Sequence, residues 1–199
     1  MNDRFFDLKK EKQDRMINAA LKIFALNGYK NSSTDDIVKQ ARISKGLLFH
    51  YFDSKLGLYS FLYSYSVRYF FMEIEGTVGK EERDFFKLYH GIEQAKFMVL
   101  RNYPYMKLFL DRAETETVSE ALLATQDNRL QYRQWKEELE KRADMSFAGS
   151  EADAEKLLKM VRYTMMGIMT THLQDQSFQA EMMLEEDLSY LEFIKRLYR

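Results

Sequence analysis

The first part of the chain alternates between apolar stripes with helical spacing and short polar breaks. Between residues 10 and 27 the apolar positions recur three and four residues apart, which is the spacing of one face of a helix. The residues of this stripe are Ile17, Ala20, Leu21, Phe24 and Ala25. Gly28 follows the last of them and predicts the end of this first helix.

Two shorter helices are expected next. Ser33 can accept hydrogen bonds from the free amides that begin a helix over about 34–41, and Ser44 can do the same for a helix over about 45–52. Only residues 42–43 separate these two helices. This spacing is that of a helix-turn-helix, although it equally fits an ordinary small helical bundle.

The remainder of the chain also predicts helices. Asp53 is expected to cap the fourth one. The further helices are expected over about 54–77, 81–102, a short stretch after Pro104, 117–145, 151–174 and 177–198. The sequence contains one proline and eight glycines, so few residues interrupt a helix. We therefore predict an all-α protein.

Composition and charge narrow the class. Hydrophobic residues make up 46% of the chain, which is enough for a buried core, and the absence of cysteine excludes disulfides and thiolate sites. No apolar run is long enough to span a bilayer, so we expect a cytoplasmic protein without a membrane partner. Residues 1–60 contain 11 Lys and Arg against 7 Asp and Glu, whereas the rest contain 19 against 24. A basic beginning on an acidic body indicates nucleic-acid contact at that end.

The segment 28–59 resembles the DNA-binding signature of the tetracycline-repressor (TetR) family. The match holds in a fixed register over Gly28-Tyr29, Ser32-Ser33-Thr34, Asp36-Ile37, Ala41, Ile43-Ser44-Lys45-Gly46, Tyr51-Phe52 and Ser54-Lys55. Two positions depart from the pattern: Arg42 stands in the turn where many members have glycine, and Leu47 replaces a frequent threonine. The resemblance covers about residues 12–60, less than a third of the chain.

The resemblance implies a two-domain architecture and a function. Residues 1–53 would form a three-helix helix-turn-helix domain that binds DNA, and residues 54–199 a helical bundle for ligand sensing and dimerisation. Such a protein is a one-component transcriptional regulator, most often a repressor. It binds palindromic double-stranded operator DNA as a homodimer and is released by a small lipophilic effector.

The residues themselves favour a DNA-reading helix that begins after Ser44. Helical spacing groups Leu48 with residues 51–52 on a core side, which leaves Gly46 and its neighbours on the other. The resemblance implies DNA contacts by Ser33, Thr34, Ser44, Lys45, Gly46, Leu47, Phe49, His50, Tyr51 and Lys55. For several of them a role without DNA contact remains open: Phe49 can pack in the core, and His50 or Lys55 can be solvated surface residues.

The second half is rich in aromatic residues, which most often means only a well-packed helical domain. In the family this bundle encloses an effector cavity, and an apolar cavity with a few polar groups suits a lipophilic ligand. The lining residues that we predict on this basis are Tyr63, Phe70, Phe97, Tyr105, Phe109, Tyr132, Trp135, Met166 and His172.

The last two helices carry apolar stripes that the resemblance identifies as a dimerisation surface. The predicted interface consists of Met160, Val161, Thr164, Met165, Gly167, Ile168, Leu184, Leu188 and Leu191. Either stripe could instead face the core, since each helix must bury one side. A dimer is expected because two recognition helices about one DNA turn apart, roughly 34 to 36 Å, bind a palindrome far better than one.

The sequence offers no catalytic or metal-binding motif. The three histidines, His50, His90 and His172, are widely separated, and no phosphate-binding glycine loop or nucleophile motif is present. We therefore expect no enzyme activity, no metal and no cofactor. Two alternatives remain: a helical interaction or adaptor protein whose N-terminal domain no longer binds DNA, and a small helical enzyme that uses the apolar cavity.

Overall fold

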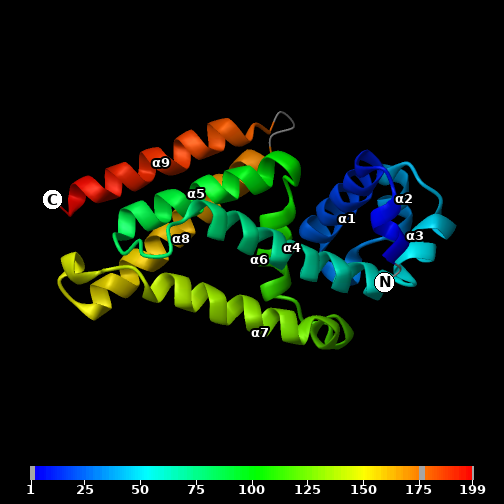
Figure 1. Cartoon of the computed structure of the whole chain (residues 1–199), viewed down its shortest axis with the longest axis horizontal. Coiled ribbons are helices and arrows are strands. Elements are labelled where there is room, and N and C mark those ends of the chain that lie inside the picture. Colours follow the sequence, from blue (N-terminus) through cyan, green and yellow to red (C-terminus); the bar gives the residue numbers. More distant parts are fainter. Residues whose placement is uncertain (1–2, 175–177, 199) are drawn as a thin grey trace. The chain divides into compact units, whose positions relative to one another are not determined.

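The computed structural model describes residues 3–174 and 178–198, and all regular structure among them is helical (Figure 1). The predicted all-α fold with an N-terminal helix-turn-helix is confirmed. The α-helices are α1 (Lys10–Asn31), α2 (Thr34–Ala41), α3 (Lys45–Phe52), α4 (Lys55–Thr77), α5 (Phe85–Asn102), α6 (Met106–Glu114), α7 (Ser119–Lys141), α8 (Glu151–Gln174) and α9 (Ala180–Leu197). Two short 3₁₀ helices, η1 (Asp3–Asp7) and η2 (Ser146–Ala148), were not predicted.

Two helix boundaries in the first part of the chain differ from the predicted caps. The backbone breaks at Gly28, where φ is 71°, but one further helical turn extends α1 to Asn31. The expected cap at Asp53 is wrong: its φ is 62°, and the hydroxyl of Ser54 accepts the hydrogen bond from the amide of Gly57 at 3.0 Å instead. Asp53, with its positive φ, ends α3, and Ser54 caps the start of α4.

Helices α5 and α7 begin after their predicted starts because side chains cap them. The carboxylate of Asp84 accepts a hydrogen bond from the amide of Lys87 at 2.9 Å, so α5 begins at Phe85 rather than near residue 81. Glu116 accepts hydrogen bonds from the amides of residues 117 and 118, so α7 begins at Ser119. The predicted start of the last helix, Ser177, lies outside the described residues.

The chain divides into two compact units, which are described separately. The first holds the described residues up to Tyr69 together with Asn102–Arg133, and the second holds Phe70–Arg101 and the described residues from Gln134 onward. Helices α4 and α7 each contribute to both. Our predicted domain boundary at residues 53 and 54 stays a prediction. None of the described helices is both long and apolar enough to cross a membrane.

In the first unit, α6 lies against α1 and fixes the N-terminal helices from one side. Rings from three helices meet between them: Phe24 lies 5.1 Å from Tyr59, which lies 5.3 Å from Phe109, measured between ring centroids. Polar contacts hold both ends of the crossing. The hydroxyl of Tyr103 donates to Asp14 at 2.6 Å, and the amide of Tyr29 donates to Glu116 at 3.0 Å.

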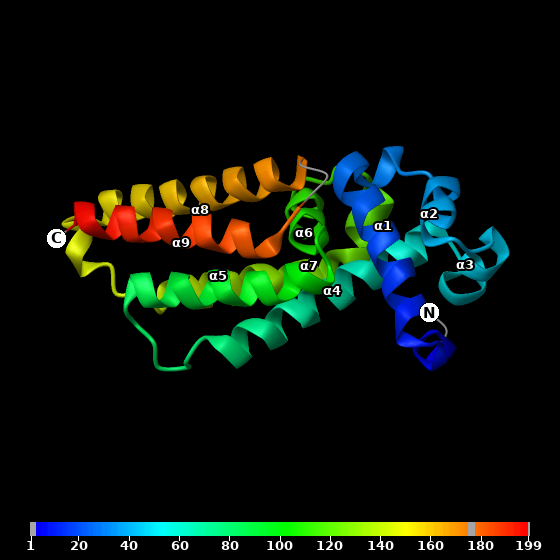
Figure 2. The same ribbon diagram turned by 90° about the horizontal axis from the view of Figure 1, so that it is seen from above.

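In the second unit, α8 and α9 lie side by side (Figures 1 and 2). Each buries one stripe, with Val161 and Met165 on α8 and Met183 and Leu191 on α9. The opposite stripes of both helices are exposed and still apolar. They include Met160, Tyr163 and Met166 on α8 and Tyr190, Phe193 and Leu197 on α9.

A buried charged cluster joins α5 to α9 in this unit. The ammonium of Lys96 forms ion pairs with Glu93 and, at 2.8 Å, with Asp187, and the side chains of all three are 6% exposed or less. Two carboxylates share one cation, so full ionisation leaves a net negative charge in the interior. Burial, helped by the charge of Glu93, accordingly raises the pKa of Asp187 to about 7.

We expect this cluster to stabilise the fold less as the pH rises. Between pH 4 and 7 the folded chain binds more protons at Asp187 than the unfolded chain, so the free energy of unfolding decreases across that range. We expect Asp187→Asn to remove most of this decrease, roughly 2 to 4 kcal/mol, in urea unfolding measured from pH 4 to 8. Asp153→Asn, at an exposed position, should leave the decrease intact. A decrease that persists in Asp187→Asn would contradict this assignment.

Candidate nucleic-acid interface

Helix α3 buries one side and leaves the other open. Leu48 and Phe52 are each 1% exposed and Tyr51 is 8% exposed. On the remaining side Lys45, Gly46 and His50 are exposed, and Leu47 and Phe49 are half-buried. The open side therefore combines one cation, one residue without a side chain and two apolar groups on a helix of two turns.

An aromatic cluster holds the buried side of α3 in place. The ring of Phe5, in η1, lies 5.0 Å from Phe52 and 5.4 Å from Phe61 of α4. Phe5 is fully buried. The sequence pattern did not reveal this contact, because η1 is too short to show a period. Helix η1 is thus part of the support beneath α3, and Figure 2 shows it close to that helix.

The turn before α3 has a tightly determined backbone. Arg42 adopts the left-handed conformation, with φ 54° and ψ 51°, and its amide donates to the carbonyls of Lys39 and Val38. The hydroxyl of Ser44 then accepts the hydrogen bond from the amide of Leu47 at 3.2 Å. Arginine at this position, where the resembled family favours glycine, thus keeps the turn but with a strained residue.

Two of the predicted DNA contacts, Ser33 and Thr34, lie at the start of α2. The hydroxyl of Ser33 accepts hydrogen bonds from the amides of Asp35 and Asp36 at 3.1 and 3.4 Å, and Thr34 is the first helical residue. Ser33 thus has a structural role as the cap of α2. The role of both residues in binding DNA stays a prediction.

Lys45 does not extend freely from the start of α3. Its ammonium lies 2.9 and 3.1 Å from the two carboxylate oxygens of Asp35 on α2. Asp35 was not among our predicted site residues. The two residues are ten positions apart on different helices, and no local periodicity relates them.

Lys55 is also engaged within the first unit. Its ammonium donates to the carbonyl of Lys30 at 3.2 Å and lies 4.6 Å from the centroid of the Tyr29 ring. Burial lowers the pKa of Lys55. Two residues on, a Cβ at Gly57 would lie 2.1 Å from the carbonyl oxygen of Phe52. Glycine at this position lets α4 begin directly against the end of α3.

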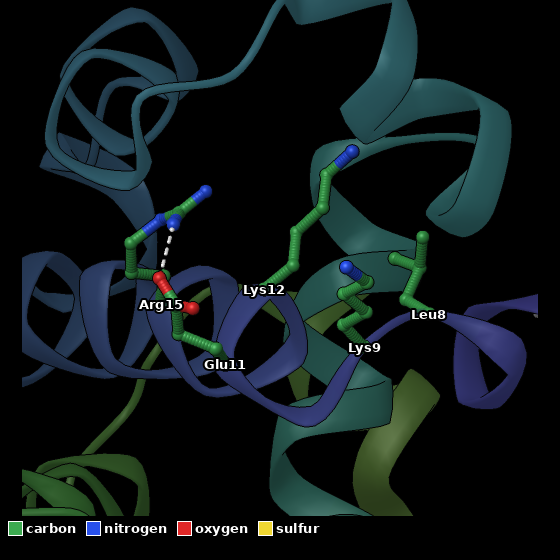
Figure 3. A pocket seen from close by; sticks show the side chains of 5 residues that line it. All are labelled: Leu8, Lys9, Glu11, Lys12 and Arg15. Carbon is green, nitrogen blue, oxygen red and sulfur yellow. Dashed lines mark hydrogen bonds and ion pairs between the residues drawn. The ribbon is translucent and has the colours of Figure 1, made fainter.

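A basic concavity of about 390 Å³ lies at the start of α1 (Figure 3). Leu8, Lys9, Glu11, Lys12 and Arg15 line it. Glu11 pairs with Arg15 at 3.1 Å, and Arg15 also donates to the carbonyl of Ala41 at the end of α2. Neither ammonium of the two lysines has an ion-pair partner among the described residues. The concavity adds positive charge close to the turn that precedes α3.

The predicted ligand-lining residues fall into both units. In the first, Tyr63 and Tyr132 are fully or almost fully buried, and Tyr63 lies 6.4 Å from Phe109 between ring centroids. The hydroxyl of Tyr63 donates to Glu114 at 3.2 Å. Tyr105 is half-buried and contacts Lys22 through its ring. These residues pack as a core, and their role as a lining stays a prediction.

The other predicted lining residues belong to the second unit. Phe70 is buried and Phe97 is half-buried, and the ring of Trp135 lies 4.3 Å from Phe71. His172 lies 2.8 Å from Glu186 through Nε2, and Met166 is 47% exposed. Their role as a lining is likewise untested.

The predicted dimer residues divide between the two sides of α8 and α9. Four are buried within the chain itself, namely Val161, Met165, Ile168 and Leu191. Met160 and Gly167 are exposed, and Thr164, Leu184 and Leu188 are half-buried. Periodicity identified both helices but did not distinguish the inward from the outward stripe, because both stripes are apolar.

Residues 16–60 match the family model described as bacterial regulatory proteins of the tetR family. Among curated proteins, the uncharacterized HTH-type transcriptional regulator YuxN of Bacillus subtilis is 47% identical over 49 residues, which are 25% of this chain and 17% of YuxN. The biofilm operon icaADBC HTH-type negative transcriptional regulator IcaR of Staphylococcus aureus is 38% identical over 47 residues, 24% of this chain and 25% of IcaR. The matched segment thus spans a quarter or less of either relative.

The fold is similar to solved structures over nearly the whole chain. A TetR family transcriptional regulator from Chloroflexus aurantiacus superposes with a TM-score of 0.65 at 19% identity, covering 99% of this chain and 95% of that one. A TetR-like transcriptional regulator from Rhodococcus gives a TM-score of 0.55 at 14% identity, covering 94% and 98%. At these identities the likeness concerns the fold. The similarity to the TetR family that the motifs predicted is confirmed for residues 16–60, which match the family model.

The strained turn makes a prediction about stability. Arg42→Gly should raise the free energy of unfolding by about 0.5 to 1 kcal/mol, because glycine adopts the left-handed conformation without a Cβ clash. Arg42→Ala removes the same side chain but retains the Cβ, and should bring no such gain. Urea unfolding of both variants decides the matter, since equal stabilities would show that the turn carries no strain.

Proposed function

We propose that this protein is a transcriptional repressor of the TetR type that binds palindromic operator DNA as a homodimer and releases it on binding a small lipophilic ligand. The observation that carries the proposal is the open side of α3. A helix whose core side is fully packed, and whose other side presents Lys45, Gly46 and Phe49, suits insertion into a major groove. IcaR, which is 38% identical to this chain over 47 residues, is named a negative transcriptional regulator.

Each group on the open side has a role in this proposal. Lys45 donates to the O6 or N7 of guanine, and Leu47 and Phe49 contact thymine methyl groups. Gly46 permits a close approach of the backbone. Thr34, the hydroxyl of Tyr51 and Lys55 contact phosphates, which position the protein without selecting a sequence.

The exposed apolar stripes of α8 and α9 support dimerisation in this proposal. Tyr163 is 67% exposed and Phe193 is 51% exposed, and both belong to stripes that continue along their helices. Patches of this kind mark protein–protein contacts. Met166 and Met160 lie on the same outward side of α8, so Met166 fits this surface better than a ligand cavity.

Release requires that the ligand favour one conformation of the dimer. Helix α4 begins beside α3 in the first unit and continues into the second unit, so one helix connects α3 to the second unit. If the ligand binds more tightly to a conformation with wrongly spaced α3 helices, operator affinity falls, by a coupling of typically about 1 to 3 kcal/mol. Operator DNA then weakens ligand binding by the same factor.

Selection of bound duplexes from a random pool tests the proposal directly. We expect a palindromic winner whose affinity decreases with salt at a log–log slope of about −6 or steeper. Lys45→Ala should reduce the preference for the winning sequence, whereas Lys39→Ala, at an exposed position on α2, should not. If no duplex is preferred at any ionic strength, the repressor proposal fails and an adaptor role is favoured. Turnover of a bound ligand would favour an enzyme.

Dimerisation is tested by sedimentation equilibrium. We expect the wild-type chain to be a dimer and the double variant Tyr163→Glu/Phe193→Glu to be a folded monomer, because charges would be buried without partners in the interface. Leu26→Glu replaces an apolar residue on α1 whose exposure, 53%, lies between those of Phe193 and Tyr163, and this variant should remain dimeric. A dimeric double variant would place the interface elsewhere.

A further inference from the structure

The ion pair between Lys45 and Asp35 joins the first turn of α3 to the first turn of α2 at an exposed position. Both partners are fixed by helix starts. Asp35 lies in the first turn of α2, where its amide donates to the hydroxyl of Ser33, and Lys45 follows the cap Ser44. Their side chains are 72% and 48% exposed, so both charged groups remain accessible.

A carboxylate at this place is chemically distinctive. It repels phosphates, so it cannot serve as one of the clamps on the DNA backbone. In the major groove an aspartate can only accept hydrogen bonds, and the groups that donate there are the amino groups of cytosine and adenine. The ammonium of Lys45 can donate three hydrogen bonds, so it can bind Asp35 and a guanine acceptor at the same time.

We propose that Asp35 is a specificity-determining residue that reads DNA together with Lys45: the lysine donates to guanine while the aspartate accepts from the cytosine amino group beside it. This inference rests on the proposed operator binding. The distances of 2.9 and 3.1 Å hold a donor and an acceptor next to each other, as the major-groove edge of a G·C pair also does. The protein thus presents the complementary pattern.

Asp35 also acts against other sequences. Where the neighbouring base offers an acceptor instead of an amino group, the carboxylate loses water and gains no partner, so the wrong duplex is penalised. An exposed ion pair contributes little to stability on its own. The side chains of Lys45 and Asp35 can therefore move toward the bases with only a small loss of free energy.

The neighbouring Asp36 provides a matched control. It lies in the same first turn of α2, is exposed, and has no ion-pair partner among the described residues. Both aspartates contribute the same charge near the DNA, but only Asp35 contacts Lys45. Asp35→Asn and Asp36→Asn therefore remove the same electrostatic repulsion and differ in the contact.

The test uses the full-length chain and the duplex selected from the random pool. Fluorescence anisotropy measures its affinity and that of duplexes with each G·C pair replaced by A·T, at one salt concentration. We expect one position at which the wild type discriminates by about ten-fold or more, and at which Asp35→Asn loses most of that factor. Asp36→Asn should retain it. Asp36→Asn should bind all duplexes more tightly than the wild type, whereas Asp35→Asn should gain affinity mainly for the duplex in which the G·C pair is replaced, because its gain at the selected duplex is offset by the loss of the cytosine contact.

Joint reading is tested by a double-mutant cycle. Asp35→Asn in the Lys45→Ala background should change discrimination little, because the pair acts as one unit. Undiminished discrimination by Asp35→Asn, or independent and additive effects of the two substitutions, would overturn the inference while leaving operator binding intact. A wild type that prefers no duplex would instead refute operator binding itself. Thermal melting of each variant checks that it is folded.

Discussion

The asymmetric burial of α3 is the constraint on which the rest of the structure depends. A helix of two turns has no stability of its own, so its shape is maintained by Leu48 and Phe52 packing against the aromatic cluster beneath. Because that packing occupies one side completely, the other side is fixed in direction. The turn at Arg42 before α3 and the close start of α4 after it further limit the orientation of so short a helix.

The sequence predicted the fold best where local signals set the structure. The serine caps determined α2 and α3, and both were predicted residue for residue. Asp53 failed as a cap because the close approach of α4 to the end of α3 gives it a positive φ, which no local pattern encodes. The support from Phe5 depends on a contact between distant segments, and was missed for the same reason.

The candidate site was predicted in its outline and not in its charge arrangement. Periodicity separated the open side of α3 from the core side, because burial follows the helical repeat. It could not reveal that Asp35 holds Lys45, since that contact depends on how two helices cross. In the second unit, periodicity identified α8 and α9 but not which apolar stripe faces inward, because hydrophobicity alone does not distinguish a core from an exposed patch.

The contact between Gly57 and the carbonyl of Phe52 couples the start of α4 to the end of α3. With no space for even a methyl group between them, the start of α4 lies directly against the backbone of Phe52, so a movement of α4 toward α3 also displaces the end of α3. At 23 residues, α4 is about 35 Å long, so a tilt of only a few degrees displaces one end by about 2 to 3 Å relative to the other. A displacement of that size is comparable to the length of a hydrogen bond, which is enough to take a side chain out of register with a base.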